Sequence, residues 1–400
     1  MAPKIAFLTA CLEPGRDGVG DYARDLASAC EFLGCDCALL ALNDRYVEHA
    51  SEERQSGAGG ELDVLRLPAT YSWEARGRRA SAWLKQLAPD VVSLQFVPYG
   101  FHPKGIVLGL ERPLRQLIAE RRLHLMLHEI WIGASRRAPL RSKLIGLLQR
   151  QVLIGLIGQL RPAVIHTTNS AYAALLNANG VNAGLLPLCG NIPVAPTIDA
   201  DWLAREFVAL GLRSDMARSR DAVWRFGFFG SLYPVWKSEP LFTIIASAAQ
   251  RVGRAVIITS VGRLGPGEDC WQDLRRRYAH QFSFAALGER PAWEVSAFLQ
   301  GMDFGLATTP WQLIGKSGTT AAMIDHGLPV VVARDDEDYG IECPLPAASL
   351  LHKVDGNLSA WMLGVRPAPP RARLSEVARR FIADLAMGRS ADTDAAVIIP

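Results

Sequence analysis

The sequence predicts an α/β protein made of two Rossmann-like, doubly wound domains that face a central cleft. The chain has 400 residues, 49% of them hydrophobic and 21% charged, which suits two or three domains with packed cores. Short apolar runs alternate with helical patterns along the first 190 residues, and the alternation starts again near residue 224. Strands that alternate with helices build parallel sheets with helices on both faces.

The first domain is expected to span residues 1–195. Its apolar runs predict strands, and the segments that repeat apolar residues at helical spacing predict helices. The expected strands are 4–10, 37–42, 62–67, 90–96, 123–128, 163–167 and 183–188. The expected helices are 20–33, 73–87, 106–121, 143–160 and 170–179.

The pattern breaks at 190–196, a segment with two prolines and no strong periodicity, so the domain boundary is expected there and the second domain covers 196–400. The expected strands are 224–230, 255–261, 282–287, 303–307 and 329–333. The expected helices are 239–252, 268–280, 293–299, 318–326 and 374–387. Whether the last helix packs back on the first domain is left open. Ligands of such sheets bind beyond the carboxyl ends of the strands, so functional residues are expected in the loops after strands.

Charge and cysteine content exclude several classes. The formal net charge of +3 is too small to indicate nucleic acid as a partner. Seven scattered cysteines without a CxxC pair indicate neither a disulfide framework nor a zinc ribbon, and no cluster of histidines and carboxylates has metal-ligand spacing. The apolar run 144–160 is interrupted by polar residues and falls short of the roughly 20 residues that cross a bilayer. These features predict a cytoplasmic protein with no metal.

The 136–161 segment is basic. No acidic residue lies between Glu129 and Asp199, and the cations there are Arg136, Arg137, Arg141, Lys143, Arg150 and Arg161. A basic amphipathic segment can lie on an anionic membrane surface, which would make the protein peripheral on the inner face of a membrane. The alternative is a buried helix with a basic end.

A glycine loop follows the first strand. Gly18 and Gly20 open a helix whose backbone N–H groups would face an anion, and the loop fits the loose GxGxxA form of the dinucleotide fingerprint. Seven residues separate this loop from its strand, whereas the fingerprint follows its strand directly. A turn without a ligand is the alternative, in which Asp21 and Tyr22 are only first-turn residues of the helix.

Two further motifs lie in the second half. A strand and turn, Phe226 to Pro234, is followed by Lys237, which could reach a diphosphate. Gly315-Lys316-Ser317 precedes an alanine-rich helix that ends at Gly327, and its N-terminus again offers N–H groups. The glycine that a Walker A loop requires upstream is Pro310, so an ATPase P-loop is rejected.

Taken in order, these motifs resemble the retaining glycosyltransferases of family 4, which have the two-domain GT-B fold. The resemblance implies that Gly18 and Gly20 support the donor diphosphate or the reacting sugar. It implies that His128, at the end of a predicted strand, lies near the donor sugar or the acceptor. From the residues alone, a buried structural histidine at this position is equally expected. It also implies that Ser231 and Lys237 lie at the leaving group, with the family's arginine replaced by Ser231, and that the turn Gly288-Glu289-Arg290 borders the nucleobase.

The sequence departs from the family at its paired glutamates. Counting back from Gly327, those positions hold Ile314 and Ala322, so the contacts to sugar and ribose are missing. The nearest polar substitutes are Lys316, Ser317, Thr319 and Thr320, and the backbone N–H groups around Gly318 are a further candidate for donor binding. A cation in place of two carboxylates is consistent with a different or more anionic donor, or with lost activity.

The function expected from the resemblance is a hexosyltransferase-like transfer, with retention, from a nucleotide-diphosphate-sugar to a hydroxyl acceptor in glycan, polysaccharide or glycolipid synthesis. His128 and Lys237 are the candidate catalytic residues, and Asp21, Tyr22 and His102 are the candidates on the acceptor side. The acceptor is a glycan, a lipid-linked or a small molecule, and the donor is a substrate, so no cofactor is expected. Two alternatives stay open: a catalytically silent nucleotide-sugar-binding protein, and a sugar-nucleotide epimerase of the same architecture. An NAD-dependent dehydrogenase ranks last.

Overall fold

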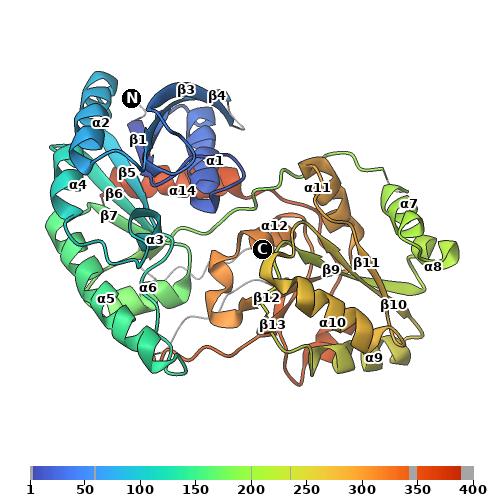
Figure 1. The fold of residues 1–400 in the computed structure, drawn as a ribbon. Helices are drawn as coiled ribbons and strands as arrows, with labels where there is room; N and C mark the ends of the chain where they lie inside the picture. Colours follow the sequence, from blue (N-terminus) through green and yellow to red (C-terminus); the bar gives the residue numbers. More distant parts are fainter. Residues whose placement is uncertain (1–2, 58–59, 200, 235, 342–348, 389–400) are drawn as a thin grey trace. The chain divides into compact units, whose positions relative to one another are not determined.

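A computed structural model describes residues 3–57, 60–199, 201–234, 236–341 and 349–388. The chain divides into two compact units (Figure 1). The first takes in the described residues up to Leu188 and those within 338–344 and 374–396, and the second takes in most of the rest. The main segment of the first unit thus ends at Leu188, before residue 195, and residues near the C-terminus also belong to this unit.

The first unit is built on an eight-stranded sheet with the order β3-β4-β2-β1-β5-β6-β7-β8. Neighbouring strands are parallel except β3 and β4. Apart from the edge strand β3, this is Rossmann order, with the topological switch point between β1 and β5. The strands are β1 (Lys4–Thr9), β2 (Asp36–Asp44), β3 (Ser51–Gly57), β4 (Gly60–Pro68), β5 (Val91–Phe96), β6 (Arg122–Leu127), β7 (Val164–Thr167) and β8 (Gly184–Leu185).

Helices cover this sheet, and the last helix in the described part of the chain is one of them (Figure 1). They are α1 (Gly18–Phe32), α2 (Trp73–Leu87), α3 (Pro98–Phe101), α4 (Glu111–Ile118), α5 (Leu140–Leu160), α6 (Ser170–Asn177) and α14 (Leu374–Met387). Helix α14 packs beside α1, and its buried Phe381 lies 5.7 Å from the ring of Phe7 in β1. Val377, Phe381 and Leu385 recur at helical spacing, which gives α14 the apolar face that it buries.

The second unit has a six-stranded parallel sheet with the order β11-β10-β9-β12-β13-β14. This is Rossmann order as well, and its switch point lies between β9 and β12. The strands are β9 (Val223–Phe229), β10 (Ala255–Val261), β11 (Ser283–Ala286), β12 (Phe304–Pro310), β13 (Val330–Arg334) and β14 (Leu351–Lys353). Two apolar clusters, one on each side of the sheet's alternating side chains, form its core.

The helices of the second unit pack on both clusters. They are α7 (Trp202–Ala209), α8 (Ser214–Arg218), α9 (Leu241–Arg251), α10 (Glu268–Tyr278), α11 (Ala292–Gly301), α12 (Gly318–Asp325) and α13 (Leu358–Gly364), with 3-10 turns at Gly265–Gly267 and Trp311–Lys316. No helix in the described part of the chain is long and apolar enough to cross a membrane.

The predicted fold class is confirmed, since both sheets are doubly wound in Rossmann order. Several elements were missed: β3, β14, α3, α7, α8 and α13. The helix expected at 106–121 is also too long, because only Glu111–Ile118 is helical, and the strand expected at 183–188 shortens to Gly184–Leu185. Gly109, with φ +80°, marks the turn that delays α4.

Candidate functional site

The loops at the switch point of the second sheet lie against each other. Gly230 follows β9 with φ +75°, and its N–H donates to Val261 O at 2.9 Å. A Cβ on Gly230 would lie 3.0 Å from Cγ2 of Thr319, at the start of α12. The loop after β9 and the first turn of α12 therefore border one place, as the sequence predicts for the ends of parallel strands.

The N-terminus of α12 leaves two backbone N–H groups for a ligand. Ser317 caps the helix: its Oγ accepts from Thr320 N at 3.2 Å and from the Thr320 hydroxyl at 2.9 Å. Ala321 N donates to Ser317 O, so within the helix the N–H groups of Gly318 and Thr319 remain. The hydroxyls of Ser317 and Thr320 thus serve the cap, and Thr320 is buried, so the backbone of Gly318 and Thr319 is the better anion-binding group.

Ser231 and Lys237 are both exposed in the segment that joins β9 to α9. Trp236 anchors this segment, because its ring is buried against Phe228 at 5.5 Å and Phe242 at 5.9 Å. No described residue forms an ion pair with the Lys237 ammonium. Lys237 is therefore a solvated cation held beside a fixed aromatic anchor.

The ends of β10 and β11 contribute an ion pair that sequence reasoning missed. Gly262 N donates to Gly288 O at 2.8 Å, and Arg263 Nε lies 2.8 Å from Glu289 Oε1, with both side chains more than half exposed. The signal was available, since Arg263 stands in a glycine-rich turn directly after a buried strand. Arg263 and Glu289 are thus the charged groups at this part of the carboxyl edge.

Arg290 is engaged inside the second unit instead. Its guanidinium donates to Leu287 O at 3.0 Å, to Glu206 at 2.7 Å and to Glu294 at 3.3 Å. These bonds tie the turn to α7 and α11. The geometry gives Arg290 a structural role that its place in the sequence did not show.

Ile314 and Ala322 both lie in an apolar cluster of the second unit, 3% and 0% exposed. The backbone of Gly190 lies on Ala322, because a Cβ on Gly190 would be 2.5 Å from the Ala322 Cα. A carboxylate at 322 would have neither water nor space. Apolar residues at positions 314 and 322 are therefore part of the packing of this unit.

A hollow of about 890 Å³ in the second unit lies away from these loops. Glu239, Arg254, Tyr278 and Phe282 line it, close to the beginnings of β10 and β11. It opens at the amino ends of the strands, opposite to the carboxyl edge where α/β sheets bind their ligands.

The glycine loop of the first unit precedes α1. Asp17 caps the helix, its carboxylate accepting from Val19 N at 3.1 Å and Gly20 N at 2.8 Å. A Cβ on Gly20 would lie 2.5 Å from Cys11 O, so the glycine lets the helix approach the backbone, whereas nothing lies within 4 Å of that position on Gly18. Gly20 is thus required for packing, and Gly18 is the open position.

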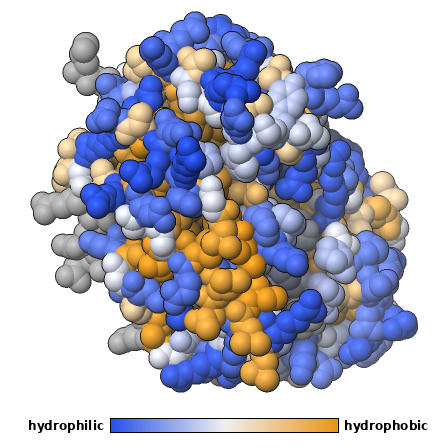
Figure 2. Space-filling model, turned by 60° about the vertical axis from the view of Figure 1, so that its left-hand side comes forward, coloured by the Kyte–Doolittle hydropathy of each residue, from blue (hydrophilic) through white to orange (hydrophobic). Residues whose placement is uncertain are grey.

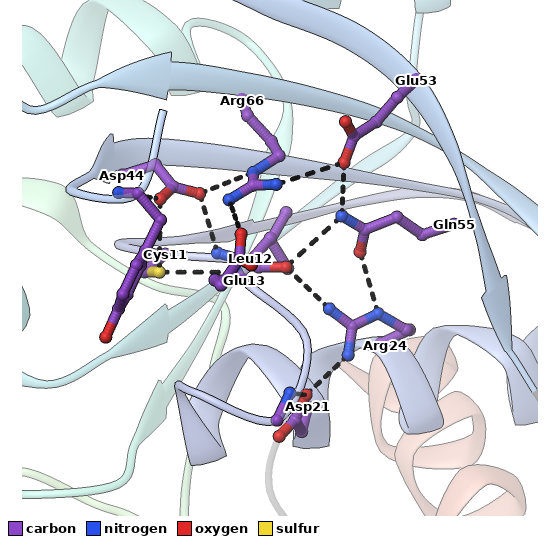
Figure 3. A network of polar contacts seen from close by, with 11 residues as sticks. Cys11, Leu12, Glu13, Asp21, Arg24, Asp44, Glu53, Gln55 and Arg66 are labelled. Atoms are coloured by element: carbon purple, nitrogen blue, oxygen red, sulfur yellow. Dashed lines mark hydrogen bonds and ion pairs between the residues drawn. The ribbon is translucent and has the colours of Figure 1, made fainter. Parts of the chain in front are cut away.

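A buried polar network braces this loop, and Figure 3 shows it. Asp44, at the end of β2, accepts from Leu12 N at 3.2 Å and from Arg66 Nε at 2.8 Å. Arg66 also bonds Glu13 at 2.5 Å. Burial acts to raise the pKa of Asp44, but the Arg66 bond, aided by backbone N–H groups, outweighs it and lowers the pKa. The carboxylate is therefore charged at neutral pH.

A second arm of the network reaches α1. Arg24 donates to Leu12 O at 2.8 Å, to Gln55 Oε1 at 2.9 Å and to Asp21 Oδ1 at 2.7 Å. The same oxygen of Asp21 accepts from Gly15 N at 3.1 Å. Asp21, a predicted acceptor-side residue, thus holds the glycine loop in shape (Figure 3).

His128 and Tyr22 meet at the carboxyl edge of the first sheet, with ring centroids 5.0 Å apart. His128 is 6% exposed, its Nε2 bonds Gln95 Oε1 at 2.9 Å, and burial lowers its pKa to about 3. It is therefore neutral at physiological pH. His102 lies in the loop after α3, where its Nδ1 accepts from Lys104 N and Ile106 N, both at 3.2 Å.

Among the described residues, no three His, Cys, Asp or Glu side chains are placed to hold a metal ion.

The candidate site residues lie in two groups, one in each unit. The structure places Gly18, Asp21, Tyr22 and His128 at the carboxyl edge of the first sheet. At that of the second it groups Ser231, Gly288, Glu289, Gly318 and Thr319.

Comparison with solved structures identifies the fold. HepE of Anabaena, solved in complex with UDP and glucose, is 16% identical, with a TM-score of 0.52 over 96% of this chain and 95% of that one. The chain has the GT-B fold. Two more proteins with this fold match at similar coverage. They are sucrose-phosphate synthase from Thermosynechococcus elongatus (12% identity, 96% of each chain, TM-score 0.53) and α,α-trehalose 6-phosphate synthase from Burkholderia multivorans (14%, 97% of each, 0.50). No protein-family profile and no curated sequence matches this GT-B chain.

Proposed function

We propose that this GT-B chain is a glycosyltransferase that moves a sugar from a nucleotide-diphosphate-sugar to a hydroxyl acceptor, with retention of configuration. The observation that supports it most is the set of anion-binding groups after the strands of the second sheet. These are the N–H groups of Gly318 and Thr319 and the exposed cation Lys237; Arg263 lies at the same edge but is paired with Glu289. The similarity in fold to HepE, which was solved with UDP and glucose, supports the same donor class.

Glycosyl transfer requires positively charged groups at the leaving group, because negative charge develops on the departing diphosphate. The bond from the anomeric carbon to the diphosphate oxygen breaks, a bond to the acceptor oxygen forms, and the hydroxyl proton passes to the departing diphosphate. Groups held at the developing charge lower the barrier. Lys237 offers a full charge and α12 offers two N–H groups, so the proposal needs no metal.

The sugar and the acceptor are met by other residues in this proposal. In the first unit Tyr22 and His128 are the candidates for contacts with the acceptor, whereas the Asp21 carboxylate is already bonded to Gly15 and Arg24. The products are glycans, polysaccharides or glycolipids made in the cytoplasm. Because Ile314 and Ala322 are buried apolar residues, no carboxylate from those positions repels an acidic sugar. Half-buried Lys316 precedes α12, so an anionic donor such as a uronic acid derivative is favoured.

A panel of nucleotide-sugars, neutral and acidic, tests the proposal through release of nucleotide with and without hydroxyl acceptors. Lys237→Ala is expected to lower turnover by one to two orders of magnitude, which corresponds to a loss of about 1.4–2.7 kcal/mol of charge stabilisation at the leaving group. Lys85→Ala, an exposed lysine on α2, removes the same charge elsewhere and should leave turnover unchanged. Equal turnover of both variants would remove Lys237 from the mechanism.

A catalytically silent nucleotide-sugar-binding protein is the second candidate. It is favoured by the burial of Ile314 and Ala322, which leaves the second unit without the carboxylates of active relatives in the family that it resembles. A thermal shift with a nucleotide-sugar, but no release of nucleotide under any condition, would support it. Conversion of the donor sugar without transfer would support an epimerase.

We also propose that α5 docks on an anionic membrane surface. Leu140, Leu144, Leu147 and Leu148 lie on one face of α5 and are 46–79% exposed. Figure 2 shows an apolar area on the face of the first unit that comes forward in this view. Arg136, Arg137 and Arg141 are exposed at the N-terminal end of the helix, where these leucines lie, and Arg161 is exposed at its C-terminal end. Exposed apolar side chains with cations nearby suit the boundary of an anionic bilayer.

Flotation with liposomes tests this surface. Vesicles that contain anionic phospholipid should bind the protein at low salt, and neutral vesicles should bind it weakly. Leu144→Glu should abolish binding, whereas Gln151→Glu adds the same charge at an exposed position of α5 and should weaken it less. Failure to bind anionic vesicles at low salt would overturn the docking proposal.

A further inference from the structure

A continuous row of buried polar side chains crosses the first sheet from His128 to α14. The hydrogen-bonded distances are 2.9 Å from His128 Nε2 to Gln95 Oε1 and 2.8 Å from Gln95 Nε2 to Ser93 Oγ. They continue with 2.8 Å from Ser93 Oγ to His124 Nδ1 and 3.1 Å from His124 Nε2 to His166 Nδ1. The last is 3.1 Å from His166 Nε2 to Asp384 Oδ2. We call these six residues the relay; none is more than 6% exposed.

The relay lies on one face of three neighbouring strands. Ser93 and Gln95 alternate on β5, and Ser93 is in register with His124 of β6. His166 comes from β7, and α14 covers this face, where Phe381 meets the His124 ring at 4.9 Å. Buried polar groups destabilise a core unless each is hydrogen-bonded, so six in a row need complete pairing.

The pairing is complete in only one direction. With the Gln95 amide placed as it is, its Nε2 donates to Ser93, and the Ser93 hydroxyl then donates to Nδ1 of His124. The His124 proton is therefore on Nε2 and is donated to Nδ1 of His166, whose own proton on Nε2 is donated to the carboxylate. A carboxylate can only accept, so Asp384 sets the direction for the whole row. Arg380 Nε lies 3.7 Å from the same carboxylate oxygen.

At the other end, the row determines which nitrogen of His128 carries the proton. Gln95 Oε1 can only accept, so the proton is on Nε2 and Nδ1 carries the lone pair. Within the described residues, Nδ1 has no hydrogen-bond partner. The atom is not fully enclosed, so it keeps some exposure to solvent. It is thus open to a small polar group at the carboxyl edge, beside Tyr22.

We propose that Asp384, acting through the relay, is a positioning residue that holds His128 as the Nε2–H tautomer, so that Nδ1 accepts a hydrogen bond from a substrate hydroxyl. Burial, which lowers the pKa of both His124 and His128, keeps both rings neutral and the direction single. The substrate hydroxyl rests on the proposed function, whereas the tautomer does not.

NMR of protein labelled with 15N-histidine tests the tautomer directly, because protonated and unprotonated ring nitrogens have well-separated shifts. The wild-type His128 signal, assigned with His128→Gln, should be that of the Nε2–H form. Asp384→Asn replaces an obligate acceptor by an amide that can also donate, so the signal should become a mixture of tautomers. Thr167→Val, which removes a buried hydroxyl bonded to Leu127 O on the neighbouring strand, is the control and should leave it unchanged.

Turnover gives the second readout. Asp384→Asn should raise KM or lower kcat/KM roughly two- to tenfold, the loss expected for one neutral hydrogen bond. An Nδ1–H signal for wild-type His128, or an unchanged tautomer in Asp384→Asn, would overturn the inference even in an inactive protein. The predicted tautomers in a protein without turnover would instead refute only the proposed transfer.

Discussion

The buried ion pair between Asp44 and Arg66, which we call the brace, leads to a quantitative prediction for the stability of Asp44→Asn. The asparagine keeps the shape of the side chain and can still accept from Leu12 N, but Arg66 loses the charge 2.8 Å from its Nε. Removing one partner of a buried ion pair costs about 3–5 kcal/mol when the other is left alone. Glu13 stays bonded to Arg66 and Glu53 lies 3.5 Å away, so we expect a smaller loss of about 2 kcal/mol.

Asp63→Asn is the matched control. Asp63 forms a 3.2 Å ion pair with Arg54 on the same sheet, but both side chains are more than 60% exposed. Such pairs contribute about 0–1 kcal/mol, so the control should lose less than about 1 kcal/mol. Urea unfolding, followed by hydrogen exchange of peptides from the first sheet, measures this unit separately from the second.

The pH dependence gives the same prediction a second test. Hydrogen bonds from Arg66 hold the pKa of Asp44 below that of an unfolded aspartate, so the charged carboxylate stabilises the fold above about pH 4. That contribution falls as the pH drops through the folded pKa. The difference between wild type and Asp44→Asn should therefore be constant near neutrality and shrink in strong acid. Equal stability of Asp44→Asn and Asp63→Asn at pH 7 would refute the brace.

Two further substitutions test the packing of the sites. Ala322→Glu introduces a carboxylate at a position that is 0% exposed. It should lower the free energy of unfolding of the second unit by several kcal/mol and leave little of that unit folded. Ala292→Glu, at the exposed start of α11, is the control and should not change the melting temperature in the same thermal unfolding assay. Gly20→Ala should lower the free energy of unfolding by about 1–3 kcal/mol, because its Cβ would lie 2.5 Å from Cys11 O. Gly18→Ala, the control, should be as stable as the wild type. Equal melting temperatures of the two variants would contradict the close approach at Gly20.

The sequence predicted those elements whose pattern is local. Buried parallel strands are nearly continuous apolar runs, so β1, β5 and β10 were visible. Strand β3 was not, because Ser51–Gly57 is a polar edge strand in which only Gln55 is buried. Helix α7 was missed for another reason: it is short, and its position in the core depends on α11 and the second sheet.

The candidate sites were predictable to the same extent. The ends of parallel strands share an edge, so glycine loops after strands could be grouped without a structure. The brace could not, since Glu13, Asp44 and Arg66 come from separate loops and strands. The relay left a weak signal, polar residues at alternate positions of buried strands, but only pairing in register shows that Ser93 meets His124.

The charged groups at the two switch points differ in whether they already have protein partners, and this difference decides which unit can supply charge in the proposed transfer. In the first unit the loop after β1 is occupied by its own ion pairs, so Asp21, Arg24 and Arg66 have protein partners already and little capacity for a ligand. In the second unit Lys237 is exposed, and Gly318 and Thr319 keep N–H groups outside the helix ladder. A group that must stabilise new charge has to be uncompensated in the resting protein, because an existing partner would have to be displaced first. If the proposed transfer takes place, the second unit is therefore the better place for the leaving diphosphate, because the loop after β1 in the first unit already has its own partners.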